Sequence, residues 1–412
     1  MIPAKPISHC RLSPSTHLIS VLNLGEQELT GVFPKTATDP VSSGPLELVW
    51  CPESGLLQLR HSFDASEMYG DNYGYRSGLN QSMIDHLGAK AASLEEVAGL
   101  TADDVVLDIG SNDGTLLKSF QVAGISKFGI DPTGEKFREF FPKDAVLNPT
   151  FFTAESYRAV AGTRKAKIVT SIAMFYDLDR PDDFVADVAA ILAKDGIWHF
   201  EQSYMPTMLR MNSYDTVCHE HLEYYSLRPI KSLLERHGLK ITTVRMNAIN
   251  GGSFAITAAH ASSAYSPETE VIQWLLAQED RLGLDTPRPF RRFEERVFEH
   301  RQNLRSLIVA LRNSGKTVLG YGASTKGNVL LQFCGITPDL VPAIAEVNAD
   351  KFGRYTPGTR IPIISEQEAR AARPDYLLVL PWHFRDGIIR REREYLAKGG
   401  RLIFPLPEIE IV

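Results

Sequence analysis

The sequence has few cysteines, no long apolar run and no dense block of basic residues, and each absence excludes a class of protein. Only 4 of the 412 residues are cysteine, so no disulfide framework is predicted. No apolar run approaches the roughly 20 residues that cross a bilayer, and residues 1–6 lack the apolar stretch of a signal peptide. Lys and Arg form no nucleic-acid-binding arm, and the formal net charge is -6. We therefore expect a soluble, cytoplasmic protein that contacts neither nucleic acid nor membrane.

The order of predicted elements divides the chain into three parts. Residues 1–85 predict short strands, best at 16–24 and 46–59, and no long helix. Residues 86–265 alternate strands with helices, which is typical of a doubly wound parallel α/β sheet; the strands are expected at 105–109, 127–130, 167–172 and 196–201. Residues 266–412 begin with a helical stretch interrupted near 283–289 and then alternate again, so they predict a second, smaller parallel sheet.

A glycine turn follows the predicted strand at 105–109. Its residues, Asp108-Ile109-Gly110-Ser111-Asn112-Asp113-Gly114, resemble the first motif of class I S-adenosylmethionine (SAM) methyltransferases. Glycines there let a ligand and the next helix approach the backbone closely. Asp131 ends the next predicted strand, where a carboxylate can accept both ribose hydroxyls. An NAD site and a plain tight turn are the alternatives. The residues predicted to bind SAM are Asp108, Gly110, Asn112, Gly114 and Asp131.

The run Cys218-His219-Glu220-His221 places proton-transfer groups side by side. Methylation at carbon requires removal of a proton next to a carbonyl, and an imidazole with a pKa of about 6.5 is a suitable base near neutral pH. The pair His219 and His221 also permits a zinc interpretation, although no third ligand stands at a suitable spacing. Alternatively, both histidines are hydrogen-bonded within a core.

A second strand–glycine–helix turn lies at 320–328. Backbone N–H groups at such a turn bind anions, and Lys326 adds a positive charge, so a diphosphate is the predicted ligand. Glu346 ends the next predicted strand, which leaves an NAD site as the alternative.

Four motifs stand in the order known from one enzyme family. They are Glu201-Gln202-Ser203-Tyr204, the His-Glu-His run, Asn250-Gly251-Gly252-Ser253 and the turn at 320–328. Together they resemble the nucleotide-sugar (dTDP-4-keto-deoxyhexose) C-methyltransferases of deoxysugar biosynthesis, and the resemblance spans essentially the whole chain. It implies an α/β fold with a small β-rich, zinc-binding type N-terminal lobe, a central SAM domain and a C-terminal Rossmann-like lobe that holds the nucleotide sugar.

The resemblance also implies roles for individual residues. His221 would remove the proton from carbon 3 of a nucleotide-linked 4-keto-6-deoxyhexose, Glu220 would orient or polarise the site, and Tyr75 would reach the substrate from the N-terminal lobe. Methyl transfer to carbon 3 would follow. The candidate contacts to the nucleotide sugar are Tyr225, Ser253, Ser324, Lys326, Asn328, Arg360 and His383.

The N-terminal lobe departs from the family's pattern. The family uses two Cys-x-x-Cys pairs for zinc, whereas here Ser13 and Ser54 replace the second thiols after Cys10 and Cys51. Neutral serine is a poor ligand, so we expect no tightly bound zinc. Further departures at Cys218, 175–177 and 251–255 bear on the identity of the sugar.

The predicted function is a SAM-dependent C-methyltransferase that acts on a nucleotide-diphosphate sugar as a monomer or homodimer. An O- or N-methyltransferase acting on another small metabolite, or a non-catalytic nucleotide-sugar-binding homologue, is the alternative.

Overall fold

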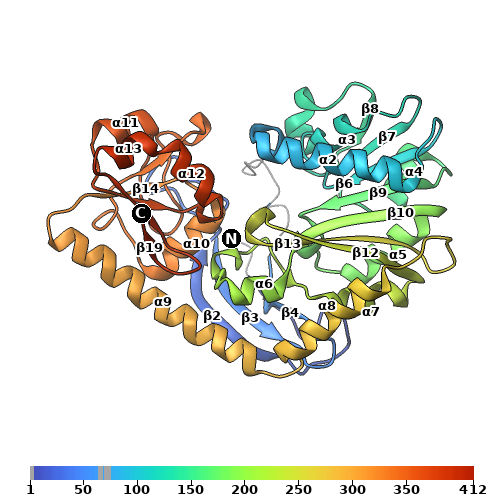
Figure 1. Cartoon of the computed structure of the whole chain (residues 1–412), viewed down its shortest axis with the longest axis horizontal. Helices are drawn as coiled ribbons and strands as arrows, with labels where there is room; N and C mark the ends of the chain where they lie inside the picture. The colour runs from blue at the N-terminus through green and yellow to red at the C-terminus, as the bar shows by residue number, and fades with distance from the viewer. Residues whose placement is uncertain (1–3, 64–67, 69–75) are drawn as a thin grey trace.

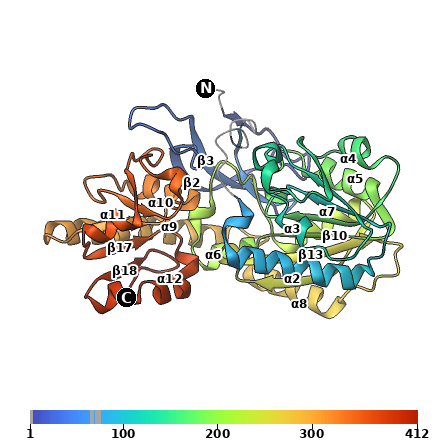
Figure 2. The same cartoon turned by 90° about the horizontal axis from the view of Figure 1, so that it is seen from above.

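The structure is a computed structural model that describes residues 4–63, 68 and 76–412. Three lobes are arranged around one centre (Figure 1). A seven-stranded domain and a six-stranded domain lie opposite each other, and the N-terminal strands lie at their junction, as the view from above also shows (Figure 2). The α/β fold predicted from the sequence is confirmed. Tyr75 lies outside the described residues.

The central domain is a seven-stranded sheet with the order β12-β13-β10-β9-β6-β7-β8. All its strands run parallel except β13, which is antiparallel to both neighbours. Its strands are β6 (Val105–Ile109), β7 (Ser126–Ile130), β8 (Ala145–Asn148), β9 (Ala166–Ile172), β10 (Leu192–Ser203), β12 (Leu239–Asn247) and β13 (Ser253–His260).

Helices cover both faces of this sheet because its strands are apolar on both sides. Val106 of β6 packs with Leu87 and Leu94 of α2 (Gln81–Ala98), whereas Val105 and Leu107 pack into the cluster on the opposite face. That second face is covered by α4 (Ala154–Ala161), α5 (Pro181–Ile191) and α7 (Leu227–Arg236), while α3 (Thr115–Ser119) joins α2. The two-residue period of the strands thus produces two separate cores.

Strands β8, β12 and β13 lie outside the predicted set. Strands β12 and β13 are joined by a short turn with a single 3-10 turn at Ile249–Gly251 and no α-helix, so the strand–helix alternation used for the prediction does not extend to them. The stretch 46–59 was also wrongly expected as one strand. It forms two, β3 (Ser43–Trp50) and β4 (Leu57–Leu59), because a turn with Gly55 at φ +72° reverses the chain.

The N-terminal sheet has the order β11-β4-β3-β2, with β2 at Ile19–Glu28 and β11 at Glu223–Tyr224. A second, two-stranded sheet pairs β1 (Lys5–Pro6) with β5 (His61–Ser62). Strand β11 directly follows the His-Glu-His run, so the N-terminal sheet anchors this run from one side.

Two helices connect the central and C-terminal domains. α8 (Thr269–Leu282) ends at Gly283 in the left-handed conformation, and α9 (Arg288–Asn313) begins beside two prolines, so the predicted interruption near 283–289 is confirmed. Trp50 of β3 packs on Phe290 of α9 with ring centroids 5.2 Å apart. The N-terminal sheet, α9 and the C-terminal domain therefore share one hydrophobic core.

The C-terminal domain is a six-stranded sheet with the order β16-β15-β14-β17-β18-β19, parallel except for β19. Its strands are β14 (Val318–Tyr321), β15 (Ile344–Glu346), β16 (Ile363–Ser365), β17 (Tyr376–Val379), β18 (Arg401–Phe404) and β19 (Glu410–Ile411). Its helices include α10 (Thr325–Cys334), α11 (Glu366–Ala371), α12 (Arg385–Arg391) and α13 (Arg393–Ala397). Among the described residues, no helix combines the length and apolarity needed to span a membrane.

Candidate active site

The glycine turn after β6 has the backbone conformation that its sequence predicts. Gly110 and Gly114 have φ of +73° and +74°, and Asn112 between them has φ of +52°. A Cβ at Gly114 would lie 2.5 Å from Pro142, so only glycine fits this close approach. Asp131 holds the turn against β7, because its Oδ2 accepts from the Asn112 backbone N–H at 2.7 Å.

Asp108 is buried at the end of β6, where its Oδ1 accepts from the Thr170 hydroxyl at 2.6 Å. Burial is the main cause that raises the pKa of Asp108 to about 7; the Thr170 hydrogen bond opposes the rise, and the nearby charges of Asp131 and Asp113 add to it. A positively charged ligand would offset burial and the neighbouring negative charges, because it would favour the ionised carboxylate of Asp108.

A cavity of about 400 Å³ opens above this turn. Asp108, Gly110, Asn112 and Asp131 line it, so the structure brings together four of the five residues predicted to bind SAM, while Gly114 packs close to Phe141 and Pro142. The cavity also contains apolar walls from Met83, Leu87 and Phe151. An acidic and partly apolar chamber fits SAM, whose sulfonium and ammonium groups are cationic and whose adenine is flat and apolar.

His221 lines the same cavity from the side of the N-terminal sheet. Its Nδ1 lies 2.9 Å from the Thr216 carbonyl oxygen, which can only accept, so Nδ1 carries the proton and Nε2 keeps a lone pair. Burial and the nearby Lys326 lower the pKa of His221 to about 4. The imidazole is therefore neutral at physiological pH, as a general base must be.

His219 points to a different environment. Its Nε2 lies 3.2 Å from the Gly44 carbonyl oxygen, and its ring packs edge-on against Phe63 at 4.7 Å. The two histidines therefore do not form the common metal site that the alternative interpretation required. No group of three or more His, Cys, Asp or Glu side chains is placed to hold a metal within the described part of the chain.

Glu220 stands between two cavities. Its carboxylate receives hydrogen bonds from the Cys218 thiol and from Thr30, whose Oγ1 is 3.5 Å from Oε2. A Cβ at Gly31 would lie 2.8 Å from Oε1, so the missing side chain lets the N-terminal lobe approach this carboxylate. Burial raises the pKa of Glu220, and the hydrogen bonds from Cys218 and Thr30 oppose this rise.

The second cavity, of about 600 Å³, lies between the N-terminal lobe and the glycine turn after β14. Its walls include Phe33, Ser324, Glu346 and Lys351. Glu220 and Thr325 line both cavities, so the two spaces meet beside the catalytic histidine predicted from the sequence.

Some of the predicted sugar contacts line a cavity, and others are buried elsewhere. Ser253 lines the first cavity, and Ser324 lines the second as the N-cap of α10. Tyr225 is fully buried in the central core, where it stacks on Phe175 at 5.4 Å. His383 lies near enough to Lys326 that burial and this cation lower its pKa to about 3.

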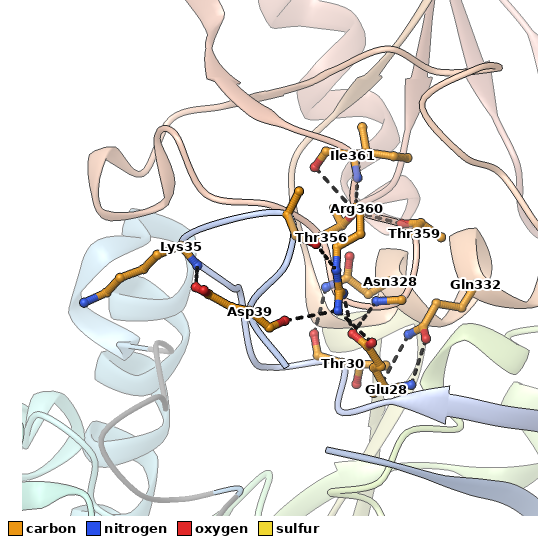
Figure 3. A network of polar contacts seen from close by, with 12 residues as sticks. Glu28, Thr30, Lys35, Asp39, Asn328, Gln332, Thr356, Thr359, Arg360 and Ile361 are labelled. Carbon is orange, nitrogen blue, oxygen red and sulfur yellow. Dashed lines mark hydrogen bonds and ion pairs between the residues drawn. The ribbon is translucent and has the colours of Figure 1, made fainter. Parts of the chain in front are cut away.

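Asn328 and Arg360 form part of a polar clamp between the N-terminal and C-terminal lobes (Figure 3). Arg360 makes a two-pronged ion pair with Glu28, and Asn328 Nδ2 donates to the Thr30 carbonyl oxygen at 2.7 Å. As far as the described residues define the cavities, neither side chain is part of a wall. The clamp instead holds the loop that carries Thr30 against Glu220.

Tyr176 and Glu201 are among the cavity residues that were not predicted as site residues. Tyr176 packs its ring against His221 at 4.5 Å, and Glu201 accepts from His86 and Lys90 at 2.7 Å each. Burial alone would raise the pKa of Glu201, but these partners lower it to about 2. An acid at the carboxyl end of a parallel strand was the available sequence signal for Glu201.

The four positions that correspond to the family's zinc ligands converge in the N-terminal lobe. Cys10 Sγ lies 3.2 Å from Ser54 Oγ, and Ser13 Oγ lies 3.8 Å from Cys51 Sγ. Burial opposes ionisation of Cys51, yet hydrogen bonds from Ser54, Ser13 and Cys10 lower its pKa below the usual value. Two thiols with two neutral hydroxyls do not match the thiolate and imidazole sets of structural zinc.

Comparison with known proteins covers nearly the whole chain. A zinc binding domain matches residues 10–69, a methyltransferase domain matches 80–244, and a C-methyltransferase C-terminal domain matches 248–407. The C-methyltransferase NovU of Streptomyces niveus is 33% identical over 412 residues, which is 99% of this chain and 97% of NovU.

Among the solved structures with a similar fold, two methyltransferases each match less than half of this chain. The magnesium protoporphyrin IX methyltransferase of Synechocystis, with bound S-adenosylhomocysteine, is 16% identical with a TM-score of 0.34, over 47% of this chain and 90% of that one. The 1,6-didemethyltoxoflavin-N1-methyltransferase of Burkholderia thailandensis is 13% identical with a TM-score of 0.34, over 44% and 82%.

The relationship to NovU and the matching domains together determine the family. The matched residues include the glycine turn after β6, the His-Glu-His run and the glycine turn after β14. This chain belongs to the SAM-dependent C-methyltransferases.

Proposed function

We propose that the enzyme methylates carbon 3 of a nucleotide-linked 4-keto-6-deoxyhexose. The observation that carries the proposal is the position of His221, a neutral base beside the point where the two cavities meet. The first cavity would hold SAM. The second, lined by a glycine turn at a helix N-terminus and by Lys351, would hold the nucleotide diphosphate. The sugar would then extend from this turn toward Glu220 and His221.

The reaction would begin at His221. Nε2 takes the proton at carbon 3, and the ketone at carbon 4 accepts the electron pair as an enolate. SAM supplies the electrophilic methyl group, and the electrons of its sulfur–methyl bond remain on sulfur. Glu220 would contact a sugar oxygen at the junction, while the Thr216 carbonyl keeps His221 in the required tautomer.

Nuclear magnetic resonance of the product made with [methyl-¹³C]SAM tests this function. We expect a new methyl carbon bonded to carbon 3 when a dTDP-4-keto-6-deoxyhexose is supplied. A panel of the corresponding UDP and GDP sugars should show weaker turnover or none. A methyl signal at the chemical shift of an O-methyl or N-methyl group would contradict carbon methylation. Absence of binding by every nucleotide sugar in calorimetry would contradict the substrate class.

A further inference from the structure

Lys326 lies in the first turn of α10, beside the C-terminal glycine turn, yet its side chain lines the SAM cavity. Its ammonium donates to the Asn250 carbonyl oxygen at 2.9 Å. The acidic side chains that line this cavity include Asp108, Asp131, Asp177, Glu201 and Glu220. Lys326 therefore brings a positive charge from the C-terminal lobe into an acidic chamber.

The carbonyl that holds Lys326 belongs to an unusual turn. Asn250, Gly251 and Gly252 have φ of +55°, +89° and +125°, so three successive residues adopt backbone conformations that L side chains rarely take. A Cβ at Gly252 would lie 2.3 Å from Thr207, which makes glycine necessary there. Glycine and asparagine tolerate such conformations best, and this turn presents the Asn250 carbonyl to Lys326.

Lys326 is close to the proposed base. Its charge contributes to lowering the pKa of His221 and partly offsets the rise that burial causes at Asp215. Asp215 itself is engaged elsewhere, because its Oδ2 accepts from the Trp382 indole N–H at 2.8 Å. The ammonium thus lies near His221, and within the described part of the chain its hydrogen bond goes to a neutral carbonyl.

A different lysine is placed for the diphosphate. Lys351 lines the second cavity, where its Nζ donates to the Ala323 carbonyl oxygen at 2.7 Å and lies 4.5 Å from the centre of the Phe33 ring. The carboxylate of Glu346 is 4.0 Å away. The two lysines therefore serve two cavities, and Lys326 belongs to the one that contains the base.

We propose that Lys326 is a catalytic residue that binds the ketone oxygen and stabilises the enolate formed when His221 removes the proton. This inference rests on the proposed function. As the carbon–hydrogen bond breaks, the proton moves to His221 Nε2 and the electron pair moves onto the ketone oxygen. The ammonium keeps its three protons, one on Asn250 and two available to that oxygen. When the new carbon–methyl bond forms, the pair returns, and the ketone is restored.

The test compares Lys326→Met with Lys351→Met. Loss of one preorganised oxyanion donor typically lowers kcat by roughly 10²–10³-fold. We expect this loss in K326M with dTDP-4-keto-6-deoxyglucose, while the KM for the sugar nucleotide and the Kd for SAM stay within roughly threefold of wild type. K351M is expected to show the reverse, a raised KM with kcat retained. Without SAM, K326M should also exchange the sugar's carbon-3 hydrogen with deuterium more slowly than wild type.

Several outcomes would overturn the inference. Wild-type kcat with a raised sugar KM in K326M would make Lys326 a substrate-binding residue only, and a raised Kd for SAM with unchanged kcat would make it a cofactor contact. K326R and K326Q guard against misfolding of K326M. Equal losses of kcat in these two variants would show that charge is not what matters. Failure of the proposed function has a separate signature, namely that wild type itself neither binds the sugar nucleotide nor exchanges its hydrogen.

Discussion

The glycine turn after β6 and the glycine turn after β14 are built alike but differ in charge. In each, a carboxylate at the end of the neighbouring strand accepts from a backbone N–H of the turn. Asp131 accepts from Asn112 at 2.7 Å, and Glu346 accepts from Ala323 at 2.9 Å. The same strand–turn–helix geometry therefore occurs twice, and it does not by itself distinguish one ligand from another.

The difference lies in the side chains that surround each turn. Asp108 adds a second buried acid to the central turn, whereas Lys351 donates to the Ala323 carbonyl of the C-terminal turn. A cationic cofactor suits the first environment, and an anionic diphosphate suits the second. If the proposed function is right, charge distinguishes the two ligands where backbone geometry does not.

Removing the base where the two sites meet should have the largest effect. His221→Ala is expected to lower kcat by about 10²–10⁴-fold, because a positioned general base is lost, while both ligands still bind. Steady-state kinetics and calorimetry measure these quantities. His219→Ala is the matched control, since His219 packs on Phe63 outside the cavity walls and should mainly lower the melting temperature. Near-normal turnover in the His221 variant would contradict the assignment.

Breaking the central turn should affect SAM alone. Asp131→Ala removes a charged acceptor and should weaken SAM binding by roughly 1.5–3 kcal/mol, about 10- to 150-fold in Kd. Glu346→Ala removes the equivalent acceptor from the other turn and should leave SAM binding unchanged. Asp131→Asn, which keeps an acceptor for the Asn112 N–H, should have an intermediate effect. An unchanged Kd for SAM in Asp131→Ala, measured by calorimetry, would remove the cofactor from this turn.

Removing the positive charge beside the glycine turn after β14 should affect the nucleotide sugar and not SAM. Lys351→Met should raise the KM for the nucleotide sugar about tenfold, because a charge-assisted contact is lost. The Kd for SAM should not change. The Lys351→Arg variant keeps the charge and should recover most of the affinity. A Lys351→Met variant with wild-type KM would show that the diphosphate lies elsewhere.

The smallest effect is expected from removing metal from the N-terminal lobe, because neither glycine turn lies in this lobe. Dialysis against a zinc chelator should leave the melting temperature unchanged, because Ser13 and Ser54 stand where a zinc site requires thiolates. Metal analysis of the purified protein gives the complementary measurement. One tightly held zinc per chain would show that Cys10 and Cys51 recruit further ligands.

Much of the site could be predicted because it depends on local backbone. A strand that ends in a glycine turn places its acid at the carboxyl edge of the sheet, so Asp108 and Asp131 meet whatever the rest of the chain does. The same reasoning placed Ser324 at the second cavity. The His-Glu-His run was found from its chemistry and its resemblance, although the run alone did not separate His219 from His221.

The directions of several predicted site side chains could not be predicted, because they depend on tertiary packing. Tyr225 turns into the core, Arg360 reaches across to Glu28, and Lys326 enters the SAM cavity from the C-terminal lobe. None of these directions follows from local sequence, because each depends on which distant segment fills the adjacent space. The Thr216 carbonyl likewise decides which nitrogen of His221 carries the proton.

Both glycine turns, the acids beside them and most of the strand–helix alternation could be predicted from residue periodicity and backbone conformation, and the type of chemistry from the motifs and their resemblance to a known family. Tertiary structure decided that two cavities meet at Glu220, that His221 is the histidine beside them, and that Lys326 and Lys351 serve different cavities. The physical reason is that a turn's shape is set by neighbours in sequence, whereas a side chain's surroundings are set by neighbours in space.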